Sequence, residues 1–270
     1  MSKNGIIFDI RMAITPLSKS KAKELKKLSS KKERDLSGLF LAEGEKCVYD
    51  LLATFDPVYL IATNEFIGSR PDLVNKYEDK IFSSDKRGIE IISSLKSLPD
   101  VIAVFRKPYF DLNNLKLNKD QFYLLLDDIQ DPGNLGTIIR TCDWFGVYLI
   151  FASENTVDVW GPKVIQATMG SLSRVRVIYT DLKRLIIENS HCKIIGTLLE
   201  GRPIGEIRGQ NGGLIIMGNE GRGISENLKK LIDLPITIPP VNSINHPDSL
   251  NVSIATAIVL SHIISDSSFS

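Results

Sequence analysis

An arginine occupies an unusual setting in the segment LLLDDIQDPGNLGTIIRTCDWFG, residues 124–146. The apolar run ends at two aspartates, and a predicted helix begins near Asn134, which is well placed as an N-cap. Arg140 then stands among apolar and small residues, where a guanidinium needs an ion-pair partner or an open cleft. In a cleft it could bind a phosphate or stabilise a developing oxyanion. A structural ion pair is the simpler alternative for this residue taken alone.

A glycine-rich loop follows another apolar run in LIIMGNEGRGIS, residues 214–225. Glycines permit the close backbone approach that ligand-binding loops need, so Gly218 is a candidate contact. The spacing G-x-x-G-x-G differs from the G-x-G-x-x-G of dinucleotide-binding folds, and no acidic residue follows at the matching position. A dehydrogenase is therefore disfavoured. Glu220 is either a catalytic carboxylate or a solvated loop residue.

A polar loop and an apolar helix make up a third segment, ITIPPVNSINHPDSLNVSIATAIVLSHI, residues 236–263. A strand ends at Pro239-Pro240, and Asp248 or Ser249 would cap a helix that begins near Leu250 and is nearly fully buried. Ser249 and Asn251 then lie at its first turn. Capping alone explains residues of these types at this place.

Six strand-like runs position these segments in a predicted C-terminal domain, residues 121–270. The runs are nearly continuous in apolar residues, which is typical of a parallel sheet covered by helices on both faces. Ligands bind beyond the carboxyl ends of such strands, where all three segments carry their polar residues. The runs are FYLLLDD, VYLIFAS, RVRVIYT, KIIGTLL, GLIIMGN and PITIPP.

A smaller α/β domain is predicted over residues 1–108, joined through a polar linker at 109–120. Residues 1–38 hold ten Lys/Arg against four Asp/Glu, although the whole chain has a net charge of only +1. Leu17 to Asp35 has the pattern of one basic amphipathic helix, which could lie along an RNA backbone. A solvated charged face is the alternative.

The remaining composition narrows the setting of the protein. The 43% hydrophobic and 24% charged residues are typical of a folded globular chain. Three widely spaced cysteines favour neither a zinc site nor a disulfide scaffold, so we expect no metal. The N-terminus lacks the pattern of a signal peptide, and no run reaches the roughly 18 apolar residues of a membrane span. We expect a soluble, cytoplasmic protein.

The three segments together resemble the motifs of the SpoU or TrmH-like branch of the SPOUT superfamily. The matching residues are D-P-G-N-x-G-x-x-x-R, G-N-E-G-x-G, and I-x-I-P followed by S-L-N-V-S, with K-V-I-Q-A-T-M-G-S between the first two. The segment LSSKKERDLSGLFLAEGEKCVYDLL also resembles, more weakly, the substrate-binding domain that precedes many of these enzymes. Pro240, Asp143 and a longer loop around His246 depart from the usual pattern, but no motif residue is lost.

This resemblance implies an RNA 2′-O-ribose methyltransferase that uses S-adenosylmethionine. It implies an α/β domain with a deep trefoil knot and a homodimer formed through the C-terminal domain. The substrate would be RNA, with ribosomal RNA favoured over transfer RNA. The implied cofactor pocket is built mainly from the backbone of Thr197, Leu198, Gly218, Ile238 and Leu250. The implied catalytic residues are Asn134, Arg140, Glu220, Ser249 and Asn251.

Arg140 is the residue expected to matter most. A guanidinium holds its proton too firmly to be a good base, so we expect Arg140 to clamp a phosphate and stabilise the developing alkoxide. Glu220 would orient Arg140, and Asn134 would set the turn. The main rival is a protein of the same fold that binds RNA without turnover, although the intact set of motif residues argues against it.

Overall fold

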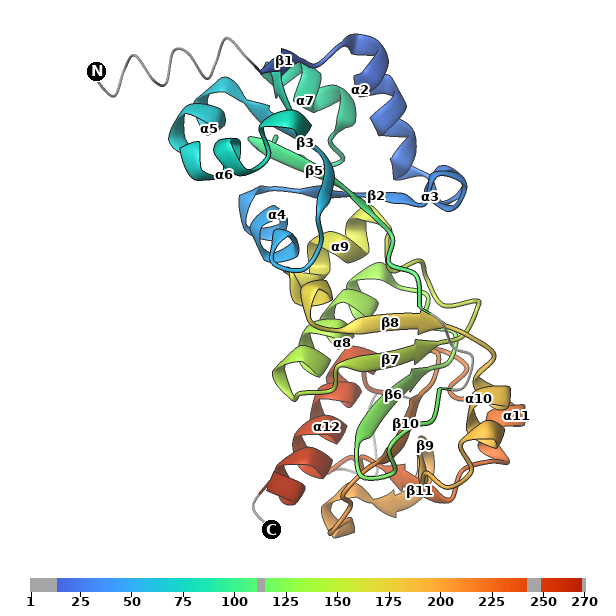
Figure 1. The fold of residues 1–270 in the computed structure, drawn as a ribbon. Coiled ribbons are helices and arrows are strands. Elements are labelled where there is room, and N and C mark those ends of the chain that lie inside the picture. Colours follow the sequence, from blue (N-terminus) through green and yellow to red (C-terminus); the bar gives the residue numbers. More distant parts are fainter. Residues whose placement is uncertain (1–13, 111–114, 242–248, 269–270) are drawn as a thin grey trace. The chain divides into compact units, whose positions relative to one another are not determined.

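The structure is a computed structural model that describes residues 14–110, 115–241 and 249–268. The chain forms two compact units. The first contains the chain up to Pro108 together with Trp160–Ser173, and the second contains Tyr109–Val159 and the chain from Arg174 onward. Figure 1 shows the elements of each unit.

The first unit is a five-stranded mixed sheet in the order β1-β4-β3-β5-β2. β4 pairs in parallel with β1 and β3, while β5 runs antiparallel to β3 and β2. Helices α2 and α7 pack against one another and share a core with the sheet. The strands are β1 (Thr15–Pro16), β2 (Leu39–Glu43), β3 (Pro57–Thr63), β4 (Ile81–Ser84) and β5 (Val101–Arg106). The helices are α2 (Lys19–Lys26), α3 (Lys31–Ser37), α4 (Glu45–Leu52), α5 (Asn64–Ser69), α6 (Pro71–Lys76) and α7 (Lys86–Ile92).

The expectation of one continuous basic helix over Leu17 to Asp35 is wrong. Helix α2 continues as a short 3₁₀ turn, η1 (Lys27–Ser29), and α3 then begins anew. Ser30 has an extended backbone, and its hydroxyl accepts the backbone N–H of Glu33 at 3.3 Å, so it caps a second helix. Arg34 is buried and donates to the carbonyls of Leu28 and Ser29 at 2.8 Å each, which leaves it unavailable to a phosphate.

Residues 160–173, with helix α9 (Pro162–Thr168) and the 3₁₀ turn η3 (Ser171–Ser173), pack with the first unit. The rings of Trp160 and Phe40 lie 4.5 Å apart between centroids, and Thr54 donates to the Ser173 carbonyl at 2.9 Å. Sequence order places this segment after the second strand of the C-terminal domain. Its packing follows from these long-range contacts, which carry no signal in the local pattern.

The second unit is a six-stranded sheet in the order β11-β9-β10-β6-β7-β8, and every pairing in it is parallel. All six apolar runs predicted from the sequence form these strands, and the predicted parallel sheet is confirmed. The strands are β6 (Phe122–Leu126), β7 (Leu149–Ala152), β8 (Arg176–Tyr179), β9 (Ile194–Pro203), β10 (Gly213–Met217) and β11 (Leu234–Thr237).

Helices cover both faces of this sheet. Figure 1 shows α8 (Pro132–Trp144) and α12 (Val252–Ser268) on one face, with α10 (Leu182–Glu188) and α11 (Glu226–Lys229) on the other. Buried side chains of alternate strand residues, such as Leu125, Phe151 and Ile216, pack against α10 and α11. The strands are therefore apolar on both sides, which is why their sequences are nearly continuous in apolar residues.

Helix α12 departs from the nearly full burial expected of it. Ile254 and Ile258 are 51% and 37% exposed and stand one turn apart, while Val259, Leu260 and Ile263 are buried. The helix thus buries one side against the second unit and presents an apolar stripe on another. Among the helices of the described residues, none combines the length and apolar character needed to cross a membrane.

Candidate active site

Asp131 caps helix α8, so the expectation that Asn134 is the N-cap is wrong. The Asp131 carboxylate accepts the backbone N–H of Asn134 at 2.8 Å, and Pro132 occupies the first helical position. Proline is favoured there because its missing N–H would have no helical partner. Asn134 therefore lies inside the first turn, and its side chain is free to bond elsewhere.

The Asn134 side chain links the three motif segments. Its amide nitrogen donates to Glu220 Oε1 at 2.9 Å, and its amide oxygen accepts from the Asn251 amide nitrogen at 2.9 Å. Glu220 follows strand β10, and Asn251 precedes helix α12. Residues separated by 86 and 117 positions thus meet in one hydrogen-bonded chain.

Asn251, rather than Ser249 or Asp248, caps helix α12. Its amide oxygen accepts the backbone N–H of Ser253 at 2.9 Å and the Ser253 hydroxyl at 2.7 Å. Ser249 is exposed, two residues before this cap. Asp248, like His246, lies outside the described residues. The expected capping role therefore belongs to Asn251, because its side chain has the reach and position to satisfy the first free N–H groups.

The direction of this hydrogen-bonded chain is fixed at both ends. The Ser253 N–H can only donate, which assigns the oxygen of Asn251 to the helix and its nitrogen to Asn134. Asn134 must then accept from Asn251 and donate to Glu220, whose ionised carboxylate can only accept. Each amide uses one donor and one acceptor in the chain. The arrangement holds the Glu220 carboxylate at a defined place.

Arg140 is exposed on α8 and forms no ion pair with any residue that the structure describes. It stands six residues after Asn134, about 9 Å farther along the helix axis at ~1.5 Å per residue. Among the described residues Glu220 accepts from Asn134 through one carboxylate oxygen, and the orientation of Arg140 by Glu220 stays a prediction. An exposed guanidinium needs no buried partner and can bind an incoming anion.

The proposed cofactor residues lie at the carboxyl edge of three adjacent parallel strands. The pairing of β9 with β10 ends at Gly196, so Thr197 and Leu198 follow directly; Gly218 follows β10, and Ile238 follows β11. Thr197 donates to the Ile216 carbonyl at 2.6 Å, which joins β9 to β10 at this edge. Leu250 adjoins Asn251 and is 49% exposed.

Gly218 is required by the packing of its own loop. A Cβ atom on Gly218 would lie 2.2 Å from the backbone carbon of Gly223 and 2.3 Å from the nitrogen of Ile224. Gly223 has a φ of +68°, a left-handed conformation that favours glycine. The two glycines let the loop turn back on itself directly above strand β10. The sequence pattern predicted that Gly218 lets a ligand approach the backbone. In the structure, the backbone of Gly223 and Ile224 lies against Gly218.

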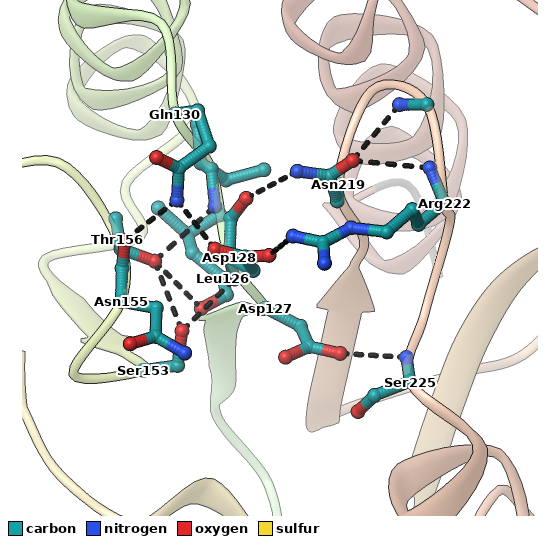
Figure 2. A network of polar contacts seen from close by, with 12 residues as sticks. Leu126, Asp127, Asp128, Gln130, Ser153, Asn155, Thr156, Asn219, Arg222 and Ser225 are labelled. Atoms are coloured by element: carbon teal, nitrogen blue, oxygen red, sulfur yellow. Dashed lines mark hydrogen bonds and ion pairs between the residues drawn. The ribbon is translucent and has the colours of Figure 1, made fainter.

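Three residues that tie this loop down were not identified from the sequence. Figure 2 shows Asp128, at the end of β6, facing Asn219 and Arg222 of the loop that follows β10. Asn219 donates to the Asp128 carbonyl at 2.7 Å, and Arg222 forms an ion pair with the Asp128 carboxylate. The opposite charges of Asp128 and Arg222 are visible in the sequence. That they meet depends on the pairing of β6 with β10, which only the structure shows.

The thiol of Cys142, on helix α8, is unsuited to act as a nucleophile. Cys142, on the buried side of α8, is 0% exposed, and burial raises the pKa of its thiol, with the charge of Asp143 adding to the increase. The thiol is therefore protonated at neutral pH and is no nucleophile. The described residues offer amides, the Glu220 carboxylate, hydroxyls, an exposed guanidinium and backbone polar atoms, which suit binding and alignment of a polar substrate.

Comparisons with known families match both parts of the chain. The sequence model of the SpoU rRNA Methylase family matches residues 121–261. The model of the MRM3-like substrate binding domain matches residues 19–103. The first match includes the first two motif segments and the third as far as residue 261, and the second contains helices α2 and α3.

Individual relatives match over nearly the whole chain. The 23S rRNA (guanosine(2553)-2′-O)-methyltransferase RlmP of Bacillus subtilis is 31% identical over 90% of this chain and 95% of its own. The crystal structure of an AdoMet-bound rRNA methyltransferase from Sinorhizobium meliloti is 27% identical, with a TM-score of 0.80 over 92% of this chain and 95% of that one. A TrmH-family protein from Porphyromonas gingivalis is 30% identical, with a TM-score of 0.77 over 91% of this chain and 97% of that one.

Proposed function

Because the chain belongs to the SpoU rRNA methylase family, we propose that it transfers a methyl group from S-adenosylmethionine to a ribose 2′-hydroxyl of RNA. The observation that carries this proposal is the hydrogen-bonded chain from Asn251 through Asn134 to Glu220. It joins the three motif segments at one edge of the sheet. A protein freed from catalysis would have less need of this set of residues.

The residues at the carboxyl edge fit S-adenosylmethionine. Gly218 and the partly buried Ile238 follow neighbouring strands, and Leu250 adjoins the cap of α12. Apolar residues whose N–H and C=O groups remain available can hydrogen-bond an adenine while their side chains pack against it. We propose that Thr197, Leu198, Gly218, Ile238 and Leu250 hold the cofactor in this way. When bound, the cofactor supplies an electrophilic methyl group on a sulfonium.

The protein residues would align and activate the ribose hydroxyl. As the C–O bond forms, the S–CH3 bond breaks and the hydroxyl proton must leave, so the oxygen gains negative charge on the way. We propose that Arg140 clamps a neighbouring phosphate and stabilises that charge. Asn134 and Asn251 hold Glu220 in place, and Ser249 offers an exposed hydroxyl beside Leu250. The products are the methylated ribose, S-adenosylhomocysteine and a proton.

The first domain, residues 1–108, is proposed to bind the RNA, with the linker at 109–120 and catalysis in residues 121–270. The exposed lysines of α2 and η1, Lys19, Lys23 and Lys27, lie in the part that matches a substrate-binding domain model. Backbone contacts of this kind give affinity without sequence information. Ribosomal RNA is the favoured substrate because RlmP, similar over 90% of this chain, is named for 23S rRNA. An enzyme with that substrate would act in the cytoplasm.

We further propose that the C-terminal segment forms a trefoil knot and that the protein is a homodimer. The family resemblance supports the knot. The apolar stripe on α12, with Ile254 and Ile258 exposed, supports a dimer interface on the second unit. Such an interface would lie close to Asn251 and could allow Arg140 to serve either its own site or that of a second copy.

Tritiated S-adenosylmethionine and ribosomal RNA from cells that lack this gene test the proposed activity. We expect label in ribosomal RNA, located to a single 2′-O-methylribose by mass spectrometry of nuclease digests. RNA from cells that retain the gene is the control and should accept little label. RNA binding without any label would favour the rival, a binding protein without turnover. If only transfer RNA became labelled, transfer RNA rather than ribosomal RNA would be the substrate.

A further inference from the structure

Asp128 has a backbone conformation that its residue type rarely adopts. Its φ is +64°, in the left-handed region, although it is not glycine. Asp tolerates this region better than most residues, but the conformation still costs free energy. Such a residue persists only where its surroundings hold it in place. The contacts of Asp128 therefore indicate what the conformation achieves.

Three segments of the second unit hold Asp128. Its N–H donates to the Ser153 hydroxyl at 2.9 Å, after β7, and its carbonyl accepts from the Asn219 amide at 2.7 Å, after β10. Its carboxylate accepts from Gln130 and forms the ion pair with Arg222. Figure 2 shows these groups converging on Asp128 from both sides. The left-handed turn aims the carbonyl and the carboxylate together at the loop that follows β10.

The loop from Asn219 to Gly223, called the frame below, is closed by its own hydrogen bonds and is held to Asp128 on one side. Asn219 Oδ1 accepts the N–H groups of Gly221 and Arg222 at 3.0 Å each, and the backbones of Asn219 and Gly223 exchange two hydrogen bonds. Both residues that contact Asp128, Asn219 and Arg222, belong to this frame. Glu220 lies between them in sequence, and its carboxylate reaches Asn134.

We propose that Asp128 is a positioning residue that locks the Asn219–Gly223 loop so that Glu220 meets Asn134. The inference rests on the proposed methyl transfer for its catalytic consequence. In this proposal the ion pair between Asp128 and Arg222 serves to position the loop rather than to stabilise the fold. Arg222 is 73% exposed, so its contribution to global stability is small, whereas the Asp128 side chain is only 18% exposed and anchors the pair. The pair acts on the geometry of the loop.

Two variants remove the side-chain part of this lock and keep the Asp128 carbonyl that accepts from Asn219. Asp128→Gly keeps the left-handed backbone, which glycine adopts freely, and removes only the carboxylate. Arg222→Gln removes the partner charge from an exposed position. Asp128→Asn retains the left-handed tendency and an acceptor for Arg222, so it serves as the conservative rescue. Arg184→Gln is the matched control, because Arg184 forms an exposed ion pair with Glu188 on α10 of the same unit.

Turnover, loop dynamics and melting temperature are measured on the full chain. For Asp128→Gly and Arg222→Gln we expect kcat to fall on the order of tenfold, with the KM for RNA unchanged, because the reacting groups lose alignment. Amide hydrogen exchange of Asn219–Gly223 in the ligand-free protein should accelerate. The melting temperature should stay at the wild-type value. The double variant should lose no more than either single one, because both break the same contact.

Asp128→Asn should recover most of the activity, and Arg184→Gln should match the wild type. Wild-type turnover and wild-type exchange in both lock variants would overturn the proposal. A loss of turnover that parallels a drop in melting temperature would also overturn it, because Asp128 would then serve general stability. If the wild type itself transfers no methyl group, the proposed function fails, and hydrogen exchange of the loop alone decides the positioning role.

Discussion

At the residue scale, single side chains of the second unit each satisfy a structural need and a chemical one. Asn251 caps α12 with its oxygen and holds Asn134 with its nitrogen. An aspartate could take the first role but has no donor for the second, whereas the amide carries an acceptor and a donor on two separate atoms. Capping alone accounts for an asparagine at this position in the sequence. The contact with Asn134, which the structure adds, accounts for the amide nitrogen.

Asn251→Asp and Asn251→Ala separate these two roles. The aspartate keeps the capping oxygen, so unfolding free energy should stay near the wild-type value, while the alanine should lose roughly 1 kcal/mol. Both variants lose the donor to Asn134 and should lose methyl transfer. Thermal unfolding and a tritium assay measure the two effects. Equal activity of the aspartate variant and the wild type would show that the bond to Asn134 is dispensable.

Arg140→Ala should abolish methyl transfer, with a loss of at least roughly 10²-fold in kcat, as for other groups that stabilise developing charge. Binding of S-adenosylmethionine, measured by calorimetry, should persist because Arg140 is not among the residues proposed to hold the cofactor. Arg140 is exposed, so the fold should be unaffected. Arg184→Ala on α10 is the control. Methyl incorporation close to wild type would remove Arg140 from the mechanism.

At the element scale, the basic N-terminal segment consists of two short helices with different exposure of their charges. On α2 and η1, Lys19, Lys23 and Lys27 are exposed, whereas Lys26 donates to the Ser93 carbonyl at 2.9 Å. On α3, Lys31 and Lys32 are exposed, whereas Arg34 is buried. The surface available to a phosphate backbone is therefore smaller than the count of basic residues indicates.

Charge reversal of the three exposed lysines should weaken RNA binding and flatten its dependence on salt. Each lost phosphate contact should reduce the slope of log K against log salt by about 0.7 to 0.9. Filter binding across a salt series measures the slope. A matched triple reversal in the second unit should leave it unchanged, at the exposed lysines Lys183, Lys193 and Lys230. An unaltered slope in the first variant would mean that α2 is only a solvated charged face.

At the scale of the whole molecule, the apolar stripe of α12 is one of the features that the isolated chain leaves exposed. Ile254 and Ile258 stand one turn apart, and the half-exposed Leu250 precedes the helix. Water contact at such a stripe is unfavourable, and burial against a second copy would relieve it. The same residues lie beside the cap that holds the candidate site together.

Ile254→Glu combined with Ile258→Glu should convert the proposed dimer into a monomer. Sedimentation at micromolar concentration should then give the 30.0 kDa mass of one chain, whereas the wild type should give twice that mass. Ile187→Glu, at a 55% exposed position on α10, controls for the loss of an exposed apolar residue. A wild type that sediments as a single chain contradicts the dimer.

Local sequence patterns predict the strands, their parallel arrangement and the three segments that carry polar residues. Strands buried on both faces leave continuous apolar runs, and their ends are marked by glycine, proline and aspartate, so both signals are local. The candidate residues Asn134, Glu220 and Asn251 could be named from the resemblance of these segments to the SpoU motifs. Their hydrogen bonds to one another could not, because these bonds depend on which strands are neighbours.

The tertiary contacts determine which residues cap the helices and which side chains pair with one another. Asp131 and Asn251 are the caps because their side chains reach free N–H groups, although neighbouring residues have equally suitable types. Glu220 binds Asn134, and Asp128 pairs with Arg222, because β6 and β10 are adjacent in the sheet. Residue type and spacing fix local conformation. Contacts between segments about 90 residues apart are fixed by the packing of the whole domain.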